Sequence, residues 1–160
     1  VVVNAGSSKG EEDFSTRLLK SLGTFLFHEV AAVPGRPMSI AIADNTPVIN
    51  LPGPPLAAFN GADWCVRATV AHYLQTVPDE PPRVRAVLAE PLTAPEHLRF
   101  TTKMRVLSQG GTVYAEPATG CSTTKSMASN GVYVSPVGTG SLGRGTQIEV
   151  ALLRGIERRD

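Results

Sequence analysis

At 160 residues, the chain is long enough for one domain or for two small ones. Its net charge of +1 offers no electrostatic attraction for a nucleic acid or an anionic membrane. No apolar run approaches the roughly 18 residues that a membrane-spanning helix needs. A zinc site is not expected, because the cysteines and histidines lack metal-ligand spacing: Cys65, Cys121, His28, His72 and His97. Two free thiols and no export signal favour a cytoplasmic protein.

The first half of the chain alternates between strand and helix patterns. Val1–Val3 is typical of a strand, and without an initiator Met before it we expect a piece of a longer protein. A helix is predicted between Asp13, a good N-cap residue, and Gly23, a common helix terminator. Its apolar residues recur at helical spacing: Phe14, Leu18, Leu19 and Leu22. Further strands are predicted over residues 24–33, 38–43 and 47–51, the last two joined by a turn at Asp44-Asn45.

The longest helical pattern follows Pro55, a residue that suits a first helical turn. Apolar residues recur every three or four positions: Phe59, Ala62, Val66, Val70, Tyr73, Leu74 and Val77. We expect a helix that runs to about Val77 and buries four of them against a sheet, namely Phe59, Val66, Val70 and Leu74. The alternation of strands and helices up to this point indicates a layered α/β fold.

The composition changes at Pro78–Pro82, which is typical of a linker. Beyond it the pattern predicts only short strands, over residues 83–88, 99–107, 112–116, 132–135 and 147–153. Glycine-rich turns at 110–111 and 138–145 separate some of them. We therefore predict two domains, an α/β domain over 1–78 and a small, mostly β domain over 79–160.

Two loops of the first half could bind an anion. The small residues of the first loop could present backbone N–H groups to a phosphate at a helix start, although a plain connecting turn has the same pattern. Arg36, on the stiff loop Pro34–Pro37, has a fork of donors that suits an oxyanion, although it could equally be a solvated surface residue. Leu51–Pro55 is either a rigid turn or the wall of a rigid pocket.

The second half offers fewer candidates. Lys103 and Arg105 alternate with apolar residues, so both cations are predicted on one face of a strand, where simple solvation is the common alternative. Cys121 and Ser122 lie in a polar loop after Gly120. No base lies near Cys121 in the sequence, so a catalytic thiol is not favoured.

Taken in order, the segments Asn4–Asp13, Pro34–Pro37 and Leu51–Pro55 resemble the molybdopterin molybdenumtransferase family, which includes MoeA-type proteins and the gephyrin E domain. The family pattern is Gly-Gly-x-Ser-x-Gly-x-x-Asp, then Lys-Pro-Gly-Lys-Pro, then Leu-Pro-Gly-Asn-Pro. The segment 120–131 also resembles the family's C-terminal β domain. The resemblance covers nearly the whole chain and implies the C-terminal part of a pterin-binding α/β domain followed by that β domain.

The resemblance implies a function and a set of site residues. Family members join molybdate to adenylylated molybdopterin with release of AMP, in a reaction assisted by Mg²⁺, and a homodimeric parent protein is implied. Asp13 matches an acidic residue of the pterin–nucleotide site, which implies a catalytic and Mg²⁺-binding role. The substrate-binding residues implied are Gly6, Ser7, Ser8, Gly10, Arg36, Pro52, Pro55, Lys103, Arg105, Cys121 and Ser122.

Four positions depart from the family pattern: Ala5 replaces a Gly, Val33 a Lys, Pro54 an Asn and Cys121 a Ser. Three hypotheses follow. The parent protein is a molybdenum-inserting enzyme; or the chain is a non-catalytic pterin- or nucleotide-binding module, which Val33 and Cys121 favour; or it is a scaffold that uses its β domain as a partner surface. The isolated chain is expected not to insert molybdenum, because the family's N-terminal domains supply further site carboxylates.

Overall fold

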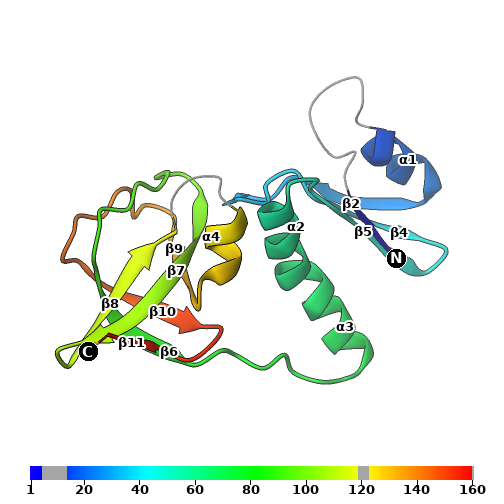
Figure 1. Ribbon diagram of the computed structural model, residues 1–160. Coiled ribbons are helices and arrows are strands. Elements are labelled where there is room, and N and C mark those ends of the chain that lie inside the picture. The colour runs from blue at the N-terminus through cyan, green and yellow to red at the C-terminus, as the bar shows by residue number, and fades with distance from the viewer. Residues whose placement is uncertain (5–13, 119–122, 160) are drawn as a thin grey trace. The chain divides into compact units, whose positions relative to one another are not determined.

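The computed structural model describes residues 1–4, 14–118 and 123–159 (Figure 1). The chain forms two compact units, unit 1 (Val1–Pro78) and unit 2 (Asp79–Asp160), and each is described by itself. The proline-rich segment 78–82 begins at this division. In the described parts of both units, no helix is long and apolar enough to cross a bilayer.

Unit 1 is built on a four-stranded sheet in the order β1-β5-β4-β2. The strands are β1 (Val2–Asn4), β2 (Thr24–His28), β4 (Ser39–Ala43) and β5 (Thr46–Leu51). Because β1 pairs with β5 in parallel, both strands end at the same edge of the sheet, where Asn4 is the register partner of Leu51. Antiparallel pairing brings the start of β4 to that edge, since Ser39 lies opposite Asn50. We call this the strand-end edge.

Helices cover both faces of the sheet in unit 1, which confirms the layered α/β class. On one face, Leu19 of α1 (Phe14–Leu22) packs with Ala41 and Val48. On the other face, the helical run after Pro55 packs over Met38, Ile49 and Leu51. Leu19 is 3% exposed and Ile49 is 2% exposed, so apolar contacts on both faces hold the sheet between its helices.

The helical run after Pro55 is shorter than the sequence predicted. It consists of α2 (Pro55–Gly61), a π-helical turn η1 (Ala62–Val66) and α3 (Arg67–Tyr73). The prediction that it reaches Val77 is wrong, because Leu74 caps it and Gln75 turns to a φ of 52°. A hydrogen bond from the Thr76 N–H to the Ala71 carbonyl, 2.9 Å long, closes the C-terminal end of α3.

The face that this run buries also differs from the prediction. Phe59, Val70 and Leu74 are 43%, 49% and 67% exposed, so their predicted burial is wrong, whereas Val66 does pack against the core. The residues buried instead are small or polar: Ala57, Asn60, Gly61 and Ala71. A Cβ on Gly61 would lie 3.0 Å from Leu51 Cδ2. The helix therefore approaches the sheet closely through its small residues.

One further expectation needs correction and one is confirmed. Residues 24–33 are not one strand, because Glu29, with a φ of 67°, ends β2 and β3 spans only Ala32–Val33. The left-handed conformations of Asp44 and Asn45 (φ 47° and 60°) form the predicted turn between β4 and β5.

Unit 2 is a small β barrel. Its strands are β6 (Arg83–Leu88), β7 (Arg99–Gln109), β8 (Thr112–Pro117), β9 (Gly131–Ser135), β10 (Gln147–Leu152) and β11 (Glu157–Arg158). The pairings β7-β8-β6-β10-β9 close on β7 again, and β11 adds in parallel beside β7. The expectation of strands alone is wrong, since α4 (Thr123–Ala128) lies between β8 and β9.

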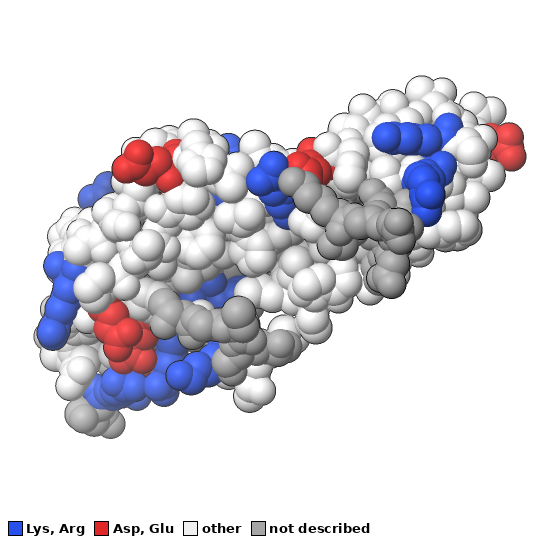
Figure 2. Space-filling model, turned by 90° about the horizontal axis from the view of Figure 1, so that it is seen from above, with Lys and Arg blue, Asp and Glu red and all other residues white. Residues whose placement is uncertain are grey.

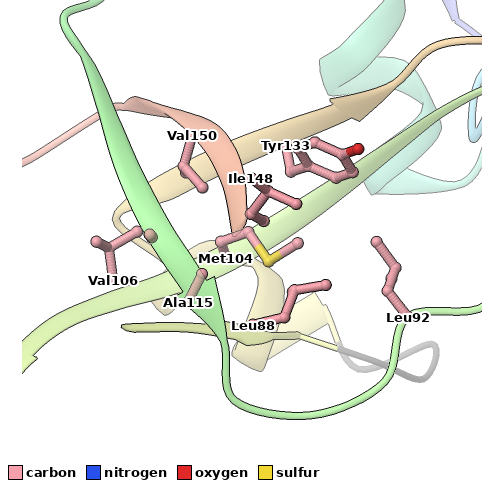
Figure 3. Packing of buried hydrophobic residues seen from close by; sticks show 9 residues of the cluster. Leu88, Leu92, Met104, Val106, Ala115, Tyr133, Ile148 and Val150 are labelled. Atoms are coloured by element: carbon pink, nitrogen blue, oxygen red, sulfur yellow. The ribbon is translucent and has the colours of Figure 1, made fainter. Parts of the chain in front are cut away.

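The interior of the barrel is apolar. Side chains from several strands point toward one another there (Figure 3), and Met104, Val106, Ala115 and Val150 are completely buried. Asn130 links this core to the segment that follows β10. Its side-chain amide forms hydrogen bonds with the N–H and the carbonyl of Val106, at 2.6 and 2.9 Å, and with the Gly155 carbonyl at 2.8 Å. Unit 2 therefore has a core of its own.

The helix placement in unit 1 predicts opposite outcomes for two truncations. Ile49→Ala removes a buried side chain beneath the helices and should lower the free energy of unfolding by about 2–5 kcal/mol. Leu74→Ala removes an exposed side chain and should change it by less than about 0.5 kcal/mol. Urea unfolding of both variants beside the unsubstituted chain measures this. A large loss for Leu74→Ala would show that the predicted, longer buried helix was right.

Candidate functional site

Two segments that are far apart in the sequence meet at the strand-end edge of unit 1. Asn4, the last residue of β1, donates a hydrogen bond from Nδ2 to the carbonyl of Pro52, 3.1 Å away and 48 residues along the chain. Pro52 is almost fully buried directly after β5. The start of the first loop is thereby fixed against the Leu51–Pro55 loop.

The loop Pro34–Pro37 is held in place by unit 1's helical run. Asn60, 2% exposed, donates from Nδ2 to the Pro34 carbonyl at 2.9 Å. Gly35 has a φ of 133°, and a Cβ there would lie 2.9 Å from the Trp64 ring. Only glycine suits both the conformation and the space. The peptide between Val33 and Pro34 is cis. The loop is a stiff support for the side chain that follows Gly35.

That side chain, Arg36, is already engaged by a carboxylate. Its Nη2 lies 2.9 Å from Glu29 Oε2, and its Nε donates to the same oxygen at 3.1 Å. The Arg36 side chain is 48% exposed and that of Glu29 is 26% exposed. Since guanidinium has five N–H donors, some remain directed to solvent. An anion at Arg36 would therefore have to share the cation with Glu29.

Pro55 occupies the first turn of α2, where its missing N–H costs no hydrogen bond. The carbonyl of Pro54, the residue that departs from the family pattern, accepts the Ala58 N–H at 2.9 Å. The prolines of this loop thus fix where β5 ends and where the helix begins. A site built at this edge would have rigid walls on the β5 side.

The two basic candidates of unit 2 have different surroundings. Lys103 is 5% exposed, whereas Arg105 lies at the surface of β7 and is bound by two carboxylates. Arg105 Nε lies 2.8 Å from Glu157 Oε2, and Glu116 lies 3.8 Å from Nη1. The hydrogen bond to Glu157 and the negative charge of Glu157 raise the pKa of Arg105. The same hydrogen bond and the positive charge of Arg105 lower the pKa of Glu157.

Arg105 borders a hollow of about 510 Å³ in unit 2, together with Glu90, Glu116, Lys125 and Glu157. Three carboxylates and two cations give this hollow a net negative charge, which does not favour an oxyanion. Figure 2 shows the same mixture on the visible surface, where acidic groups lie among the basic ones.

Several predicted site residues lie outside the described residues: Gly6, Ser7, Ser8, Gly10, Asp13, Cys121 and Ser122. The described part of the chain contains no group of three His, Cys, Asp or Glu side chains that could hold a metal ion. The roles predicted for all these residues, and for Arg36, Pro52, Pro55, Lys103 and Arg105, stay predictions.

The structure adds residues that the sequence reasoning missed. Asn4, Glu29 and Asn60 position the loops of the strand-end edge through the contacts described above. Asn60 had no distinct signal, because the same helical segment also contains the polar residues Asp63 and Arg67. Glu29 had none, since its contact with Arg36 depends on the break after β2.

Comparisons with known proteins agree with this architecture. Residues 1–72 match the family described as "Probable molybdopterin binding domain". The molybdopterin molybdenumtransferase of Bacillus subtilis is 26% identical over 158 residues, 96% of this chain and 37% of that protein. That of Synechococcus elongatus is 29% identical over 150 residues, 91% of this chain and 36% of that protein. The chain thus spans little more than a third of these curated relatives.

Solved structures show the same fold. A molybdopterin biosynthesis MoeA protein from Pyrococcus horikoshii has a TM-score of 0.75 at 24% identity and covers 97% of this chain and 37% of its own. A molybdenum cofactor biosynthesis protein from Pyrococcus furiosus has a TM-score of 0.67 at 22% identity, over 89% of this chain and 55% of its own.

Fold and matches together define a class, that of a molybdopterin-binding α/β domain joined to a small β barrel. Within this class, the chain is similar over nearly its whole length to molybdopterin molybdenumtransferases, proteins of molybdenum cofactor biosynthesis.

The clamp on the Pro34–Pro37 loop can be tested through Asn60. Asn60→Ala leaves the Pro34 carbonyl without its donor and should lower the free energy of unfolding by about 1–3 kcal/mol. Differential scanning calorimetry measures the loss. Thr24→Ala, at the exposed start of β2, serves as the control for a polar truncation without such a bond. Equal effects of the two substitutions would contradict the clamp.

The Arg105–Glu157 pair makes a prediction for pH. Because the folded protein lowers the pKa of Glu157, the pair's stabilising contribution is present above the ordinary Glu pKa and is lost as pH falls through the lowered value. Both groups are exposed, so the contribution is small. An NMR titration should place the pKa of Glu157 below the ordinary range, and Arg105→Gln should raise it. A titration that Arg105→Gln leaves unchanged would contradict this assignment.

Proposed function

We propose that the parent protein inserts molybdate into adenylylated molybdopterin and that unit 1 of this chain supplies part of the pterin–nucleotide site at its strand-end edge. The observation that carries the proposal is the convergence of β1, the Leu51–Pro55 loop and the Pro34–Pro37 loop at that edge. Open α/β sheets bind their ligands beyond the carboxyl ends of their strands. The match of residues 1–72 to the molybdopterin-binding family supports the same region.

The roles within this site rest on the sequence resemblance. Gly6, Ser7, Ser8 and Gly10 would present backbone N–H groups to the phosphate portion of the ligand. Asp13 would hold the Mg²⁺ that assists cleavage of the phosphoanhydride, and molybdate would be the second substrate. A homodimeric parent and a cytoplasmic setting belong to the same proposal.

The second candidate function is a pterin- or nucleotide-binding module without chemistry, and the ion pair of Arg36 favours it. The described loop 33–37 carries one cation, because Val33 stands in place of a Lys, and Glu29 already neutralises that cation. A compensated cation attracts a bare oxyanion weakly. Binding at this edge would then depend on hydrogen bonds to an organic phosphate more than on charge.

The share of Arg36 in ligand binding can be measured with AMP as the probe. Arg36→Ala should weaken AMP binding about tenfold, the scale of one hydrogen bond to a charged group. Glu29→Gln should strengthen it, because it frees the guanidinium from its partner carboxylate. Isothermal titration calorimetry gives both affinities.

The matched control is Arg67→Ala, because Arg67 is also a half-exposed arginine of unit 1 and its Nε lies 3.1 Å from an Asp63 carboxylate oxygen. It should leave AMP binding unchanged. Equal losses for Arg36→Ala and Arg67→Ala would remove Arg36 from the site, and a weaker complex with Glu29→Gln would contradict the competition between Glu29 and the ligand.

Turnover separates the two candidate functions. The isolated chain, supplied with adenylylated molybdopterin, molybdate and Mg²⁺, should release no AMP, because it spans little more than a third of the relatives it matches. The full parent protein should release AMP if the insertion function is right. Binding without AMP release by the parent would favour the non-catalytic module instead.

A further inference from the structure

Three polar side chains form a row across adjacent strands of unit 1. In the sheet register, His28 of β2 lies opposite Ser39 of β4, and Ser39 lies opposite Asn50 of β5. Ser39 and Asn50 are completely buried. No hydrogen-bond partner is present for His28 Nε2, Ser39 Oγ, Asn50 Nδ2 or Asn50 Oδ1 in the described structure. We call these residues the polar row.

The polar row lies on the face of the sheet that α1 covers. Directly opposite residues of an antiparallel pair share a face, and so do residues two apart on one strand. Asn50 is therefore on the same face as Val48, and Ser39 on the same face as Ala41, and both of these apolar residues pack with Leu19 of α1. The polar row thus interrupts an otherwise apolar face, and it does so one residue before the end of β5.

Burying the polar atoms of this row is unfavourable unless they find hydrogen-bond partners. An unsatisfied buried polar group costs about 1–3 kcal/mol, and an amide contributes a donor group and an acceptor. In unit 2, the buried side-chain atoms without a partner are hydroxyls, on Thr101, Thr102 and Ser135. Among the described residues, Asn50 is the one buried amide with neither atom paired. The polar row is therefore suited to an enclosed occupant that offers a donor and an acceptor side by side.

We propose that the polar row binds the hydrogen-bonding edge of a heterocycle, with Asn50 pairing with the adjacent N–H and C=O of a pterin lactam. The proposal rests on the proposed function and places the ring of the ligand on the α1 face beside the strand-end edge. The row crosses two strand spacings, about 10 Å in all, which is long enough for a bicyclic ring to contact more than one member. The adenine of a nucleotide presents the same chemistry through its amino group and neighbouring ring nitrogen.

The test compares affinity and stability in the full 160-residue chain. Hydroxymethylpterin and AMP are the two probes, measured by calorimetric titration, and thermal melting follows each variant. Asn50→Leu replaces the amide by an apolar group of similar size, and Ser39→Ala removes one hydroxyl. Ser135→Ala is the matched control, because its hydroxyl is also completely buried and unpaired but belongs to unit 2.

The expected result is a division between binding and stability. Asn50→Leu should weaken pterin binding about tenfold or more while the melting temperature stays the same or rises, because the free protein loses an unsatisfied amide. Ser39→Ala should weaken binding by a smaller factor, about threefold, and Ser135→Ala should leave it unchanged. A loss confined to AMP would keep the polar row as the site and identify the adenine as its occupant.

Other outcomes overturn the proposal. Unchanged affinity for both probes in Asn50→Leu and Ser39→Ala, with a chain that does bind them, removes the polar row from the site and leaves the proposed function standing. A lower melting temperature or a failure to fold in both variants, with affinity retained in the folded fraction, would show that the amide is satisfied by interior water. If the unsubstituted chain binds neither probe, the proposed function fails together with this inference.

Discussion

The parallel pairing of β1 with β5 is the constraint on which the candidate site depends. Register partners Val3 with Asn50 and Asn4 with Leu51 bring the ends of two distant strands to one edge. The hydrogen bond from Asn4 to the Pro52 carbonyl then fixes the two outgoing loops against each other. An antiparallel β1 would direct its following loop to the opposite edge of the sheet, so no site could form between these two segments.

Charge compensation within each unit shapes what this chain can bind. Arg36 is paired with Glu29 in unit 1, and Arg105 with Glu157 in unit 2. Neither arginine is an uncompensated cation, so electrostatic attraction for a small oxyanion is weak at both. In the proposed site, directional hydrogen bonds from stiff loops and from the buried amide of Asn50 would be the remaining source of affinity. That balance favours a large, partly apolar ligand that carries a phosphate over molybdate alone.

The sequence predicted the features that depend on local patterns. The helix ended by Gly23 and the turn at Asp44-Asn45 could be predicted because capping and turn residues act over a few positions. The buried face of α2 could not, since the close approach at Gly61 depends on Leu51 beneath it. The contact of Arg36 with Glu29 and the polar row depend on strand breaks and on register, which one sequence does not reveal.

The most direct test of the account is an NMR titration of the chain with AMP and hydroxymethylpterin, followed through the backbone amides. The account predicts shifts at the strand-end edge, at Asn4, Arg36 and Gly53, and at Asn50 on the adjoining polar row. It predicts none at the Asp44-Asn45 turn on the opposite edge of the sheet. Shifts confined to that turn, or to the barrel of unit 2, would contradict the account.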